Sequence, residues 1–331
     1  MIDEWPRDLI ELLVNPKPTE PIAIWIGAGL GAELGYVLTT PLVERLVKEC
    51  EDAGCPRADI QQAKDLLYKK SDYRMAAEEC WRVLNDPARF RAVLVGAFSQ
   101  RQETETGLRA CEAILRTPFN TYVTTNYNTS LSVVAQDLGR RDRMYALAAD
   151  VVYPHLDPSN LRERCISYIH SNVTQADSIV LRASTFHEAY GVSSRLTFFL
   201  EDLFTTHNVL FFGTDARDED INWILDRMRR VFPGTYPAVP SKRRYVLLPI
   251  LEQGVPTGHP LDSVFGIKPL WFTVKRREVE AEDGTVSVTT DWGKLYEMLV
   301  DLHEQTEIRW RSGQVSAVGA IPASQAYQEA V

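Results

Sequence analysis

The chain has 331 residues, of which 45% are hydrophobic and 24% charged, enough for one large α/β domain or two modest ones. Its formal net charge of −9 argues against a nucleic-acid partner held mainly through phosphate contacts. No apolar stretch reaches the length that crosses a bilayer, and the acidic residues 1–13 lack the basic start of a signal peptide. We therefore expect a cytoplasmic protein without membrane contact.

The five cysteines carry no sign of a metal site. They form no C-x-x-C pair, and no histidine lies near them at metal-ligand spacing. An odd number without a regular framework is typical of reduced thiols. We expect neither zinc nor another bound metal.

The first part of the chain predicts one buried strand followed by many helices. A short helix is expected at 7–14, a buried strand at 22–26 and a helix at 41–53. Residues 58–116 contain only amphipathic helical segments. They predict a helical module, over about 41–116, inserted between two strands of a sheet.

The rest of the chain alternates between strand and helix signals. The expected strands are 119–126, 145–147, 165–170, 178–182, 207–213 and 243–249. The expected helices are 129–138, 183–206, 218–232 and 292–310. Residues 269–276 and 285–290 read as a peripheral hairpin, and 312–331 as a flexible tail after a domain that spans 1–311.

This alternation predicts an α/β fold with a Rossmann-like, doubly wound and mostly parallel sheet. In such sheets a ligand sits at the carboxyl ends of the strands. The polar motifs of this chain follow Ile26, Thr125, Ile169 and Phe212, all at expected strand ends. We therefore expect them to meet in one crevice.

A glycine-rich turn follows the first strand. Gly27, Ala28 and Gly29 would allow backbone N–H groups to approach a pyrophosphate at the start of a helix. The spacing is not that of the G-x-G-x-x-G fingerprint. The alternative is a tight strand–helix turn that binds nothing.

Three further strand ends carry candidate side chains. Thr125 and Asn126 offer hydroxyl and amide groups for a ribose or a water, or form an Asx-turn. His170 is a candidate general base, although a lone histidine is more often structural. Gly213 and Thr214 are candidate adenosine contacts; Asp220 is one too, unless it only stabilises its helix start.

Taken in order, these segments resemble the sirtuin-like family over residues 20–250: a G-A-G turn, a helical insertion, T-T-N-Y, a strand ending in I-H, and F-F-G. The resemblance implies that NAD lies in the crevice. Gly27, Ala28 and Gly29 would hold the pyrophosphate, Asn126 the nicotinamide ribose, and Gly213 with its loop the adenosine. His170 would be the catalytic histidine.

The zinc-binding cysteine pairs of sirtuin deacylases are absent from this sequence. The resemblance is thus to the zinc-free branch, which implies an NAD glycohydrolase of bacterial anti-phage, abortive-infection systems. It also implies a homo-oligomer or an infection-sensing partner, such as a HerA-type ATPase. Three positions depart from the family pattern, with Gly31 for serine, Asn128 for aspartate and Ser171 for glycine.

The alternatives to NAD hydrolysis use the same crevice differently. The chain would sense NAD or ADP-ribose without cleaving it, or transfer ADP-ribose to protein. A third alternative is a structural subunit of a defence complex. Free nicotinamide, labelled protein and complex formation, respectively, distinguish these functions.

Overall fold

The structure is a computed structural model. It describes residues 5–15, 17, 19–99, 104–140, 142–146, 164–191, 194–214, 219–231, 242–251, 266–280, 286–291 and 293–311. The tail predicted at 312–331 lies outside these residues, as does much of the loop before Glu219.

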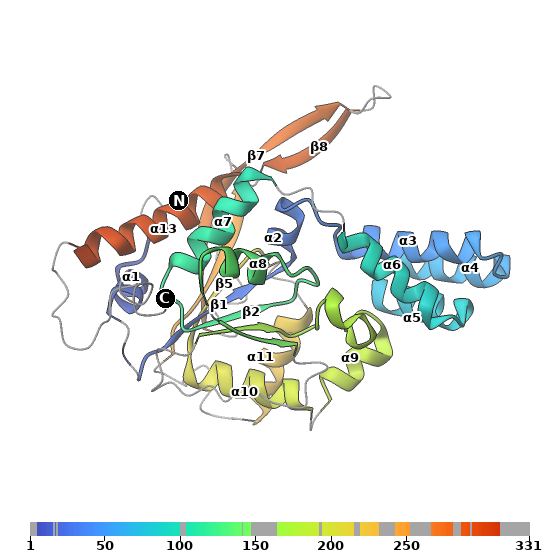
Figure 1. The fold of residues 1–331 in the computed structure, drawn as a ribbon, viewed down its shortest axis with the longest axis horizontal. Coiled ribbons are helices and arrows are strands. Elements are labelled where there is room, and N and C mark those ends of the chain that lie inside the picture. The colour runs from blue at the N-terminus through green and yellow to red at the C-terminus, as the bar shows by residue number, and fades with distance from the viewer. Residues whose placement is uncertain are drawn as a thin grey trace.

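The described strands form one eight-stranded sheet in the order β3-β4-β2-β1-β5-β6-β7-β8, parallel except for the antiparallel pair β7–β8. Their bounds are β1 Ile22–Ile26, β2 Thr121–Thr124, β3 Arg143–Ala146, β4 Cys165–Tyr168, β5 Asn208–Phe212, β6 Arg244–Leu251, β7 Ile267–Glu280 and β8 Val286–Asp291. The predicted Rossmann-like α/β fold is confirmed. The peripheral hairpin expected at 269–276 and 285–290 is only partly right, because residues 267–274 of β7 pair with β6 in the main sheet. Only residues 275–280 form a hairpin with β8, which projects from the molecule in Figure 1.

The central strand β1 is buried on both sides because helices cover both faces of the sheet. Ile22, Ile24 and Ile26 point into one core, while Ala23 and Trp25 point into the other. This is the period of two that a strand imposes on its side chains. It explains why the sequence shows a continuous apolar run at this strand instead of an alternating one.

Two helical layers enclose these cores (Figure 1). On one face lie α1 Arg7–Val14, α2 Ala28–Glu33, α7 Glu105–Arg116, α8 Ser130–Asp137 and α13 Gly293–Arg311. On the other lie α9 Ala183–Ala189, α10 Arg195–Thr206 and α11 Glu219–Val231. In the first layer α7 packs against α13.

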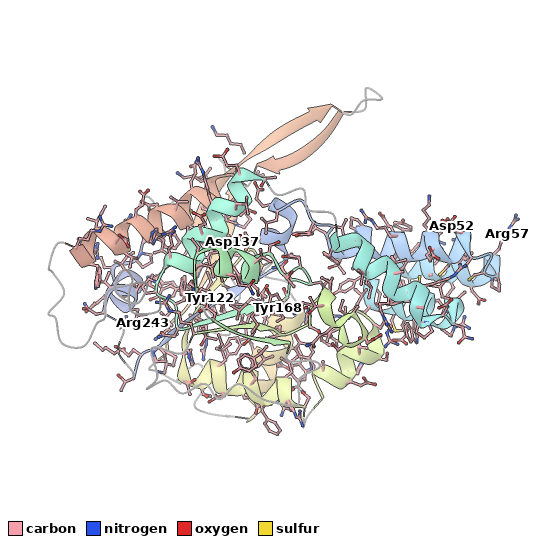
Figure 2. All side chains as sticks on the ribbon, in the orientation of Figure 1. Asp52, Arg57, Tyr122, Asp137, Tyr168 and Arg243 are labelled. Carbon is pink, nitrogen blue, oxygen red and sulfur yellow. The ribbon has the colours of Figure 1, made fainter. Side chains whose placement is uncertain are left out.

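A group of helices projects sideways from the sheet (Figure 1). It consists of α3 Thr39–Asp52, α4 Arg57–Lys64, the π-helical turn η1 Asp65–Lys69, α5 Tyr73–Leu84 and α6 Pro87–Ser99. We call it the helical module. It is shorter than the expected insertion over about 41–116, because α7 Glu105–Arg116 packs against α13 in the layer over the sheet. Asp52 and Arg57 mark its far end in Figure 2.

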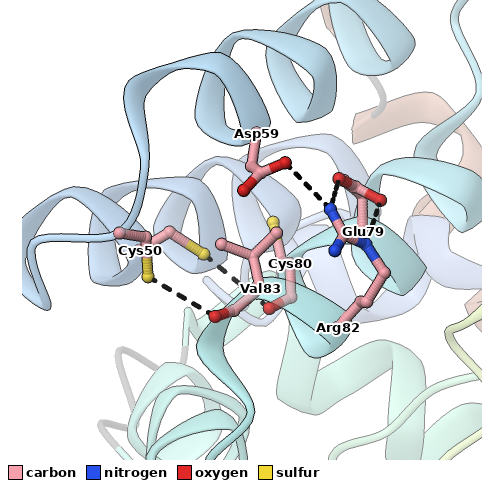
Figure 3. Close-up of polar contacts among 7 residues, drawn as sticks. Cys50, Asp59, Glu79, Cys80, Arg82 and Val83 are labelled. Atoms are coloured by element: carbon pink, nitrogen blue, oxygen red, sulfur yellow. Dashed lines mark hydrogen bonds and ion pairs between the residues drawn. The ribbon is translucent and has the colours of Figure 1, made fainter.

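Polar contacts join the helices of this module (Figure 3). The Cys50 thiol of α3 donates to the Cys80 carbonyl of α5 at 3.8 Å. Arg82 of α5 donates to Asp59 of α4 at 3.0 Å and to the neighbouring Glu79. These hydrogen bonds link α3, α4 and α5 to one another within the helical module.

The strand predicted at 178–182 is wrong. The segment holds the end of a 3-10 helix, η2 Val173–Ser178, and then an extended connection to α9. Its apolar residues Ile179, Val180 and Leu181 are buried, which explains the strand-like pattern. The segment is not among the eight strands of the sheet, and the amide of Val180 instead donates to His170 O at 3.1 Å.

Candidate functional site

The strands around β1 end level with one another. Ile26 of β1 pairs with Thr124 of β2 and with Phe212 of β5, and Thr124 pairs with Tyr168 of β4. The chain leaves β1 toward β2 and later returns on its other side as β5, which makes this edge a topological switch point. The segments that follow the four strands are thereby brought together, as the sequence predicted.

A cavity of about 350 Å³ opens at this edge, a size at the lower end of that of small-molecule sites. Loops at the ends of the strands contribute Ala28, Gly31, Thr125, Asn126, Tyr127, Asn128, His170, Val180, Gly213 and Thr214. The segment after α2 and the helical module contribute Tyr36, Val37, Leu38, Thr39, Leu42, Tyr73, Arg74 and Phe98. The cavity therefore lies between the sheet and the helical module.

The glycines of the first turn serve a close approach between two loops. A Cβ at Gly27 would lie 2.4 Å from the Gly213 carbonyl oxygen, and one at Gly29 would lie 3.0 Å from the same atom. The amide of Gly27 donates to Phe212 O at 2.8 Å, and that of Gly29 donates to Gly213 O at 3.0 Å. Both N–H groups are thus bonded within the protein, while Ala28 between them lines the cavity.

Asn126 is held in one orientation by its amide nitrogen. Nδ2 donates to Gly27 O at 2.8 Å and to Thr124 Oγ1 at 3.0 Å. The Thr124 hydroxyl itself donates a hydrogen bond to Ile26 O at 3.0 Å, so both partners of Nδ2 act as acceptors toward it. This network fixes the amide with Oδ1 turned toward Gly31, where a Cβ would lie only 2.6 Å away.

Asn128 stands beside Asn126 and completes a polar pair over Gly31. Its Oδ1 accepts from the Ser130 amide at 3.2 Å, and its Nδ2 would lie 3.2 Å from a Cβ at Gly31. The acceptor Oδ1 of Asn126 and the donor Nδ2 of Asn128 therefore flank the same glycine. Two of the three departures from the family pattern, at Gly31 and Asn128, are neighbours in space.

His170 reaches the cavity through a turn just beyond β4. The amide of Ile169 still donates to Thr124 O at 3.0 Å, after which Ser171 adopts a positive φ of 62°. Such a φ favours glycine, which accounts for the glycine that the family pattern has there. His170 is 6% exposed, lines the cavity, and bonds Tyr190 Oη through Nε2 at 2.9 Å.

The loop after β5 supplies a buried hydroxyl that no other described residue bonds. Gly213 has a φ of 64°, and Thr214 follows it into the cavity wall. Thr214 Oγ1 is buried and has no hydrogen-bond partner among the described residues. A buried hydroxyl left in this way costs about 1–3 kcal/mol, which a ligand hydroxyl or phosphate oxygen would recover.

Two further predicted site residues are Thr125 and Asp220. Thr125 lines the cavity, and its amide donates to Ile26 O at 3.2 Å. The backbone of Asp220 lies in the first turn of α11, and its side chain is outside the described part of the structure. Its contact with adenosine stays a prediction.

Sequence reasoning placed the crevice between the sheet and the helical module but identified none of the residues that the module contributes to it. Arg74 lies in the first turn of α5 and is the one Arg or Lys among the described residues that line the cavity. Its guanidinium lies 3.8 Å above the ring of Phe186 in α9. No spacing in the sequence indicated this, because the contact joins segments that are more than 100 residues apart.

The described residues show neither a metal-binding cluster nor a membrane span. They contain no cluster of three or more His, Cys, Asp or Glu side chains arranged to hold a metal ion. Within the same residues, no helix combines the length and the apolar character needed to cross a membrane.

Fold and site define the class of protein. Residues 120–253 of this Rossmann-like chain match the family described as SIR2-like domain. Among curated proteins, the NAD(+) hydrolase ThsA of Cytobacillus dafuensis is 23% identical over 221 residues, or 67% of this chain and 40% of that protein. The NAD(+) hydrolase ThsA of Bacillus cereus (strain MSX-D12) is 23% identical over 234 residues, or 68% and 44%. The chain thus spans about two fifths of the length of these relatives.

Proposed function

We propose that this chain binds NAD in the cavity and hydrolyses its nicotinamide–ribose bond. The observation that carries the proposal is that the oriented Oδ1 of Asn126 and the ring of His170 belong to one cavity at the switch point of a SIR2-like sheet. The unpartnered hydroxyl of Thr214 is suited to a dinucleotide. The two NAD(+) hydrolases among the relatives support the same substrate.

The proposed chemistry needs no general acid. Nicotinamide leaves as a neutral molecule from a cationic pyridinium, and the ribose passes through a transition state that resembles an oxocarbenium ion. Water then adds to the anomeric carbon and loses a proton. NAD and water give nicotinamide, ADP-ribose and one proton.

Two side chains have defined tasks in this reaction. Asn126 Oδ1 accepts a hydrogen bond from a ribose hydroxyl or from the attacking water, because Nδ2 is already bound by Gly27 and Thr124. His170 accepts a proton from the ribose hydroxyl or from that water. The wall of the helical module, including Phe98 and Tyr73, keeps bulk water from the reacting carbon.

The test measures nicotinamide released from NAD by the purified chain and by His170→Ala and Asn126→Ala. Both variants should lose at least about 100-fold in turnover. His187→Ala, on the exposed side of α9, is the matched control, and Asn120→Ala tests an asparagine at the opposite end of β2. Nicotinamide release by His170→Ala at the wild-type rate would remove this residue from the mechanism.

Binding of NAD or ADP-ribose without cleavage is the second candidate function. The departures at Gly31, Asn128 and Ser171 favour it, because the first two lie directly against Asn126. Calorimetric titration with NAD and with ADP-ribose, run beside the nicotinamide assay, separates the two functions. Saturable binding with no release of nicotinamide would identify a sensor.

We further infer that NAD loss is an effector step of anti-phage defence, carried out with a sensing partner or in a homo-oligomer. The resemblance to the zinc-free sirtuin-like branch supports this role. Phage infection of cells that carry either the wild-type gene or His170→Ala, with its neighbouring genes, tests it. Cellular NAD should fall after infection only with the wild type, and equal NAD in both strains would refute the role.

A further inference from the structure

We propose that Tyr190 is the positioning residue of His170, and that the helical module holds it in place. Tyr190 Oη lies 2.9 Å from His170 Nε2, and the two rings meet edge to face at 6.0 Å. Tyr190 is 2% exposed. The proposal rests on the proposed function, in which His170 exchanges a proton with the substrate.

The partner of one imidazole nitrogen determines what the other nitrogen can do. A neutral histidine has one N–H and one lone pair, and a hydrogen bond to either nitrogen fixes the rotation of the ring. The Tyr190 hydroxyl can donate or accept, and the proposal is that it accepts from Nε2–H. When Nε2–H donates to Tyr190 Oη, the lone pair lies on Nδ1, which then acts as the base. Tyr190 thus assigns the proton-accepting nitrogen without touching the substrate.

Aromatic neighbours fix the position of Tyr190. Its ring stacks on Phe186 at 4.4 Å between centroids and 26° between planes, and Trp223 of α11 packs edge-on at 5.2 Å. The amide of Tyr190 also donates to Phe186 O at 2.9 Å. A ring enclosed in this way has little freedom to move its hydroxyl away from His170.

The N-terminal half of α9 is in turn attached to α5. Arg74 lies over the Phe186 ring, and Glu78 accepts a hydrogen bond from the Ser184 amide at 2.8 Å. Arg182 lies 4.2 Å above the ring of Trp81. The helical module is therefore linked to His170 indirectly: α5 contacts α9, and Tyr190 at the end of α9 bonds His170.

The test combines the ¹⁵N spectrum of His170, which needs no substrate, with the rate of nicotinamide release. Tyr190→Phe removes the hydroxyl and keeps the stacked ring. In ¹⁵N-histidine-labelled protein, with His170→Gln used for assignment, the wild type should show His170 mainly as the Nε2–H tautomer. In Tyr190→Phe the ¹⁵N resonances of His170 should shift as the tautomers mix, and kcat for nicotinamide release should fall roughly 10-fold with KM unchanged.

Tyr168→Phe is the matched control. It removes another buried hydroxyl, which joins β4 to Ser132 of α8 at 2.6 Å (Figure 2). It should lower stability yet leave kcat and the His170 resonances unchanged. An unchanged His170 spectrum in Tyr190→Phe overturns the proposal at any rate of turnover, and so does a wild-type kcat in that variant. If the wild type releases no nicotinamide, the proposed function fails, while the spectrum still decides whether Tyr190 sets the tautomer.

Discussion

Asn126 shows how a single side chain acquires a defined role from its surroundings. Its two donor bonds go to oxygens that can only accept, so its own oxygen is left for the cavity. The sequence suggested either a ligand contact or an Asx-turn at this position. In the structure Nδ2 donates to Thr124 Oγ1, a local contact, and to Gly27 O at the end of the neighbouring strand, which no local turn provides.

Gly31→Ala tests this arrangement. The new Cβ would lie 2.6 Å from Asn126 Oδ1, so the amide must move away from its oriented position. Alanine also favours the helix α2 by up to about 1 kcal/mol, so the thermal midpoint should be equal or higher. Nicotinamide release should fall at least about 10-fold.

The control is Gly96→Ala in α6, where an added Cβ meets no atom within 4 Å. It should keep full activity. Wild-type turnover in Gly31→Ala would show that the exact position of the Asn126 oxygen does not matter.

At the scale of elements, the junction between β1 and α2 depends on contact with the end of β5. Gly27→Ala would place a Cβ 2.4 Å from the backbone oxygen of Gly213 and 2.6 Å from Thr214 Cγ2. Backbone cannot rotate away as a side chain does, so the two loops must separate. We expect a loss of about 1–3 kcal/mol in the free energy of unfolding, measured by urea titration.

Gly96→Ala again provides the comparison, because the same substitution there should stabilise by up to about 1 kcal/mol. Equal stabilities of the Gly27 and Gly96 variants would contradict the packing seen between these loops.

The sequence predicted the elements well where a short segment determines its own structure. Buried apolar runs followed at once by glycine, T-T-N or I-H located the ends of β1, β2, β4 and β5, and hence most of the strand-end residues of the cavity. The segment at 178–182 misled because burial alone produces the same apolar pattern as a strand. Its residues Ile179, Val180 and Leu181 are buried without joining the eight-stranded sheet, a difference that only the assembled structure reveals.

The helical side of the site was beyond sequence reasoning for a related reason. Tyr73, Arg74 and Phe98 occupy ordinary positions on amphipathic helices, and only the docking of the module against the sheet turns them toward the cavity. Tyr190 ends a short helix and carries no motif. Contacts between distant segments decide these roles.

At the scale of the whole molecule, stability should decline in mild acid because of His207, which links α10 to β5. Burial, with a smaller effect of the Lys242 charge, lowers the pKa of His207 from 6.5 to about 4. Between pH 6.5 and about pH 4, His207 is therefore protonated in the unfolded chain but neutral in the folded chain. Stability is complete above about pH 6.5 and falls as the pH drops, by about 2 kcal/mol at pH 5.

His207→Gln removes this titration. The difference in the free energy of unfolding between pH 7.5 and pH 5 should be about 2 kcal/mol smaller in the variant than in the wild type. His187→Gln, at an exposed histidine, should behave as the wild type does. Identical pH dependence in His207→Gln and the wild type would show that His207 is protonated at its ordinary pH in the folded protein.

The central claim is that four strand ends and the helical module form one site for a dinucleotide. A crystal structure of His170→Ala grown with NAD tests it most directly. We predict NAD in the cavity, with a ribose hydroxyl or a water bonded to Asn126 Oδ1 and a ligand oxygen bonded to Thr214 Oγ1. An empty cavity at saturating NAD, or NAD bound elsewhere on the protein, would contradict the account.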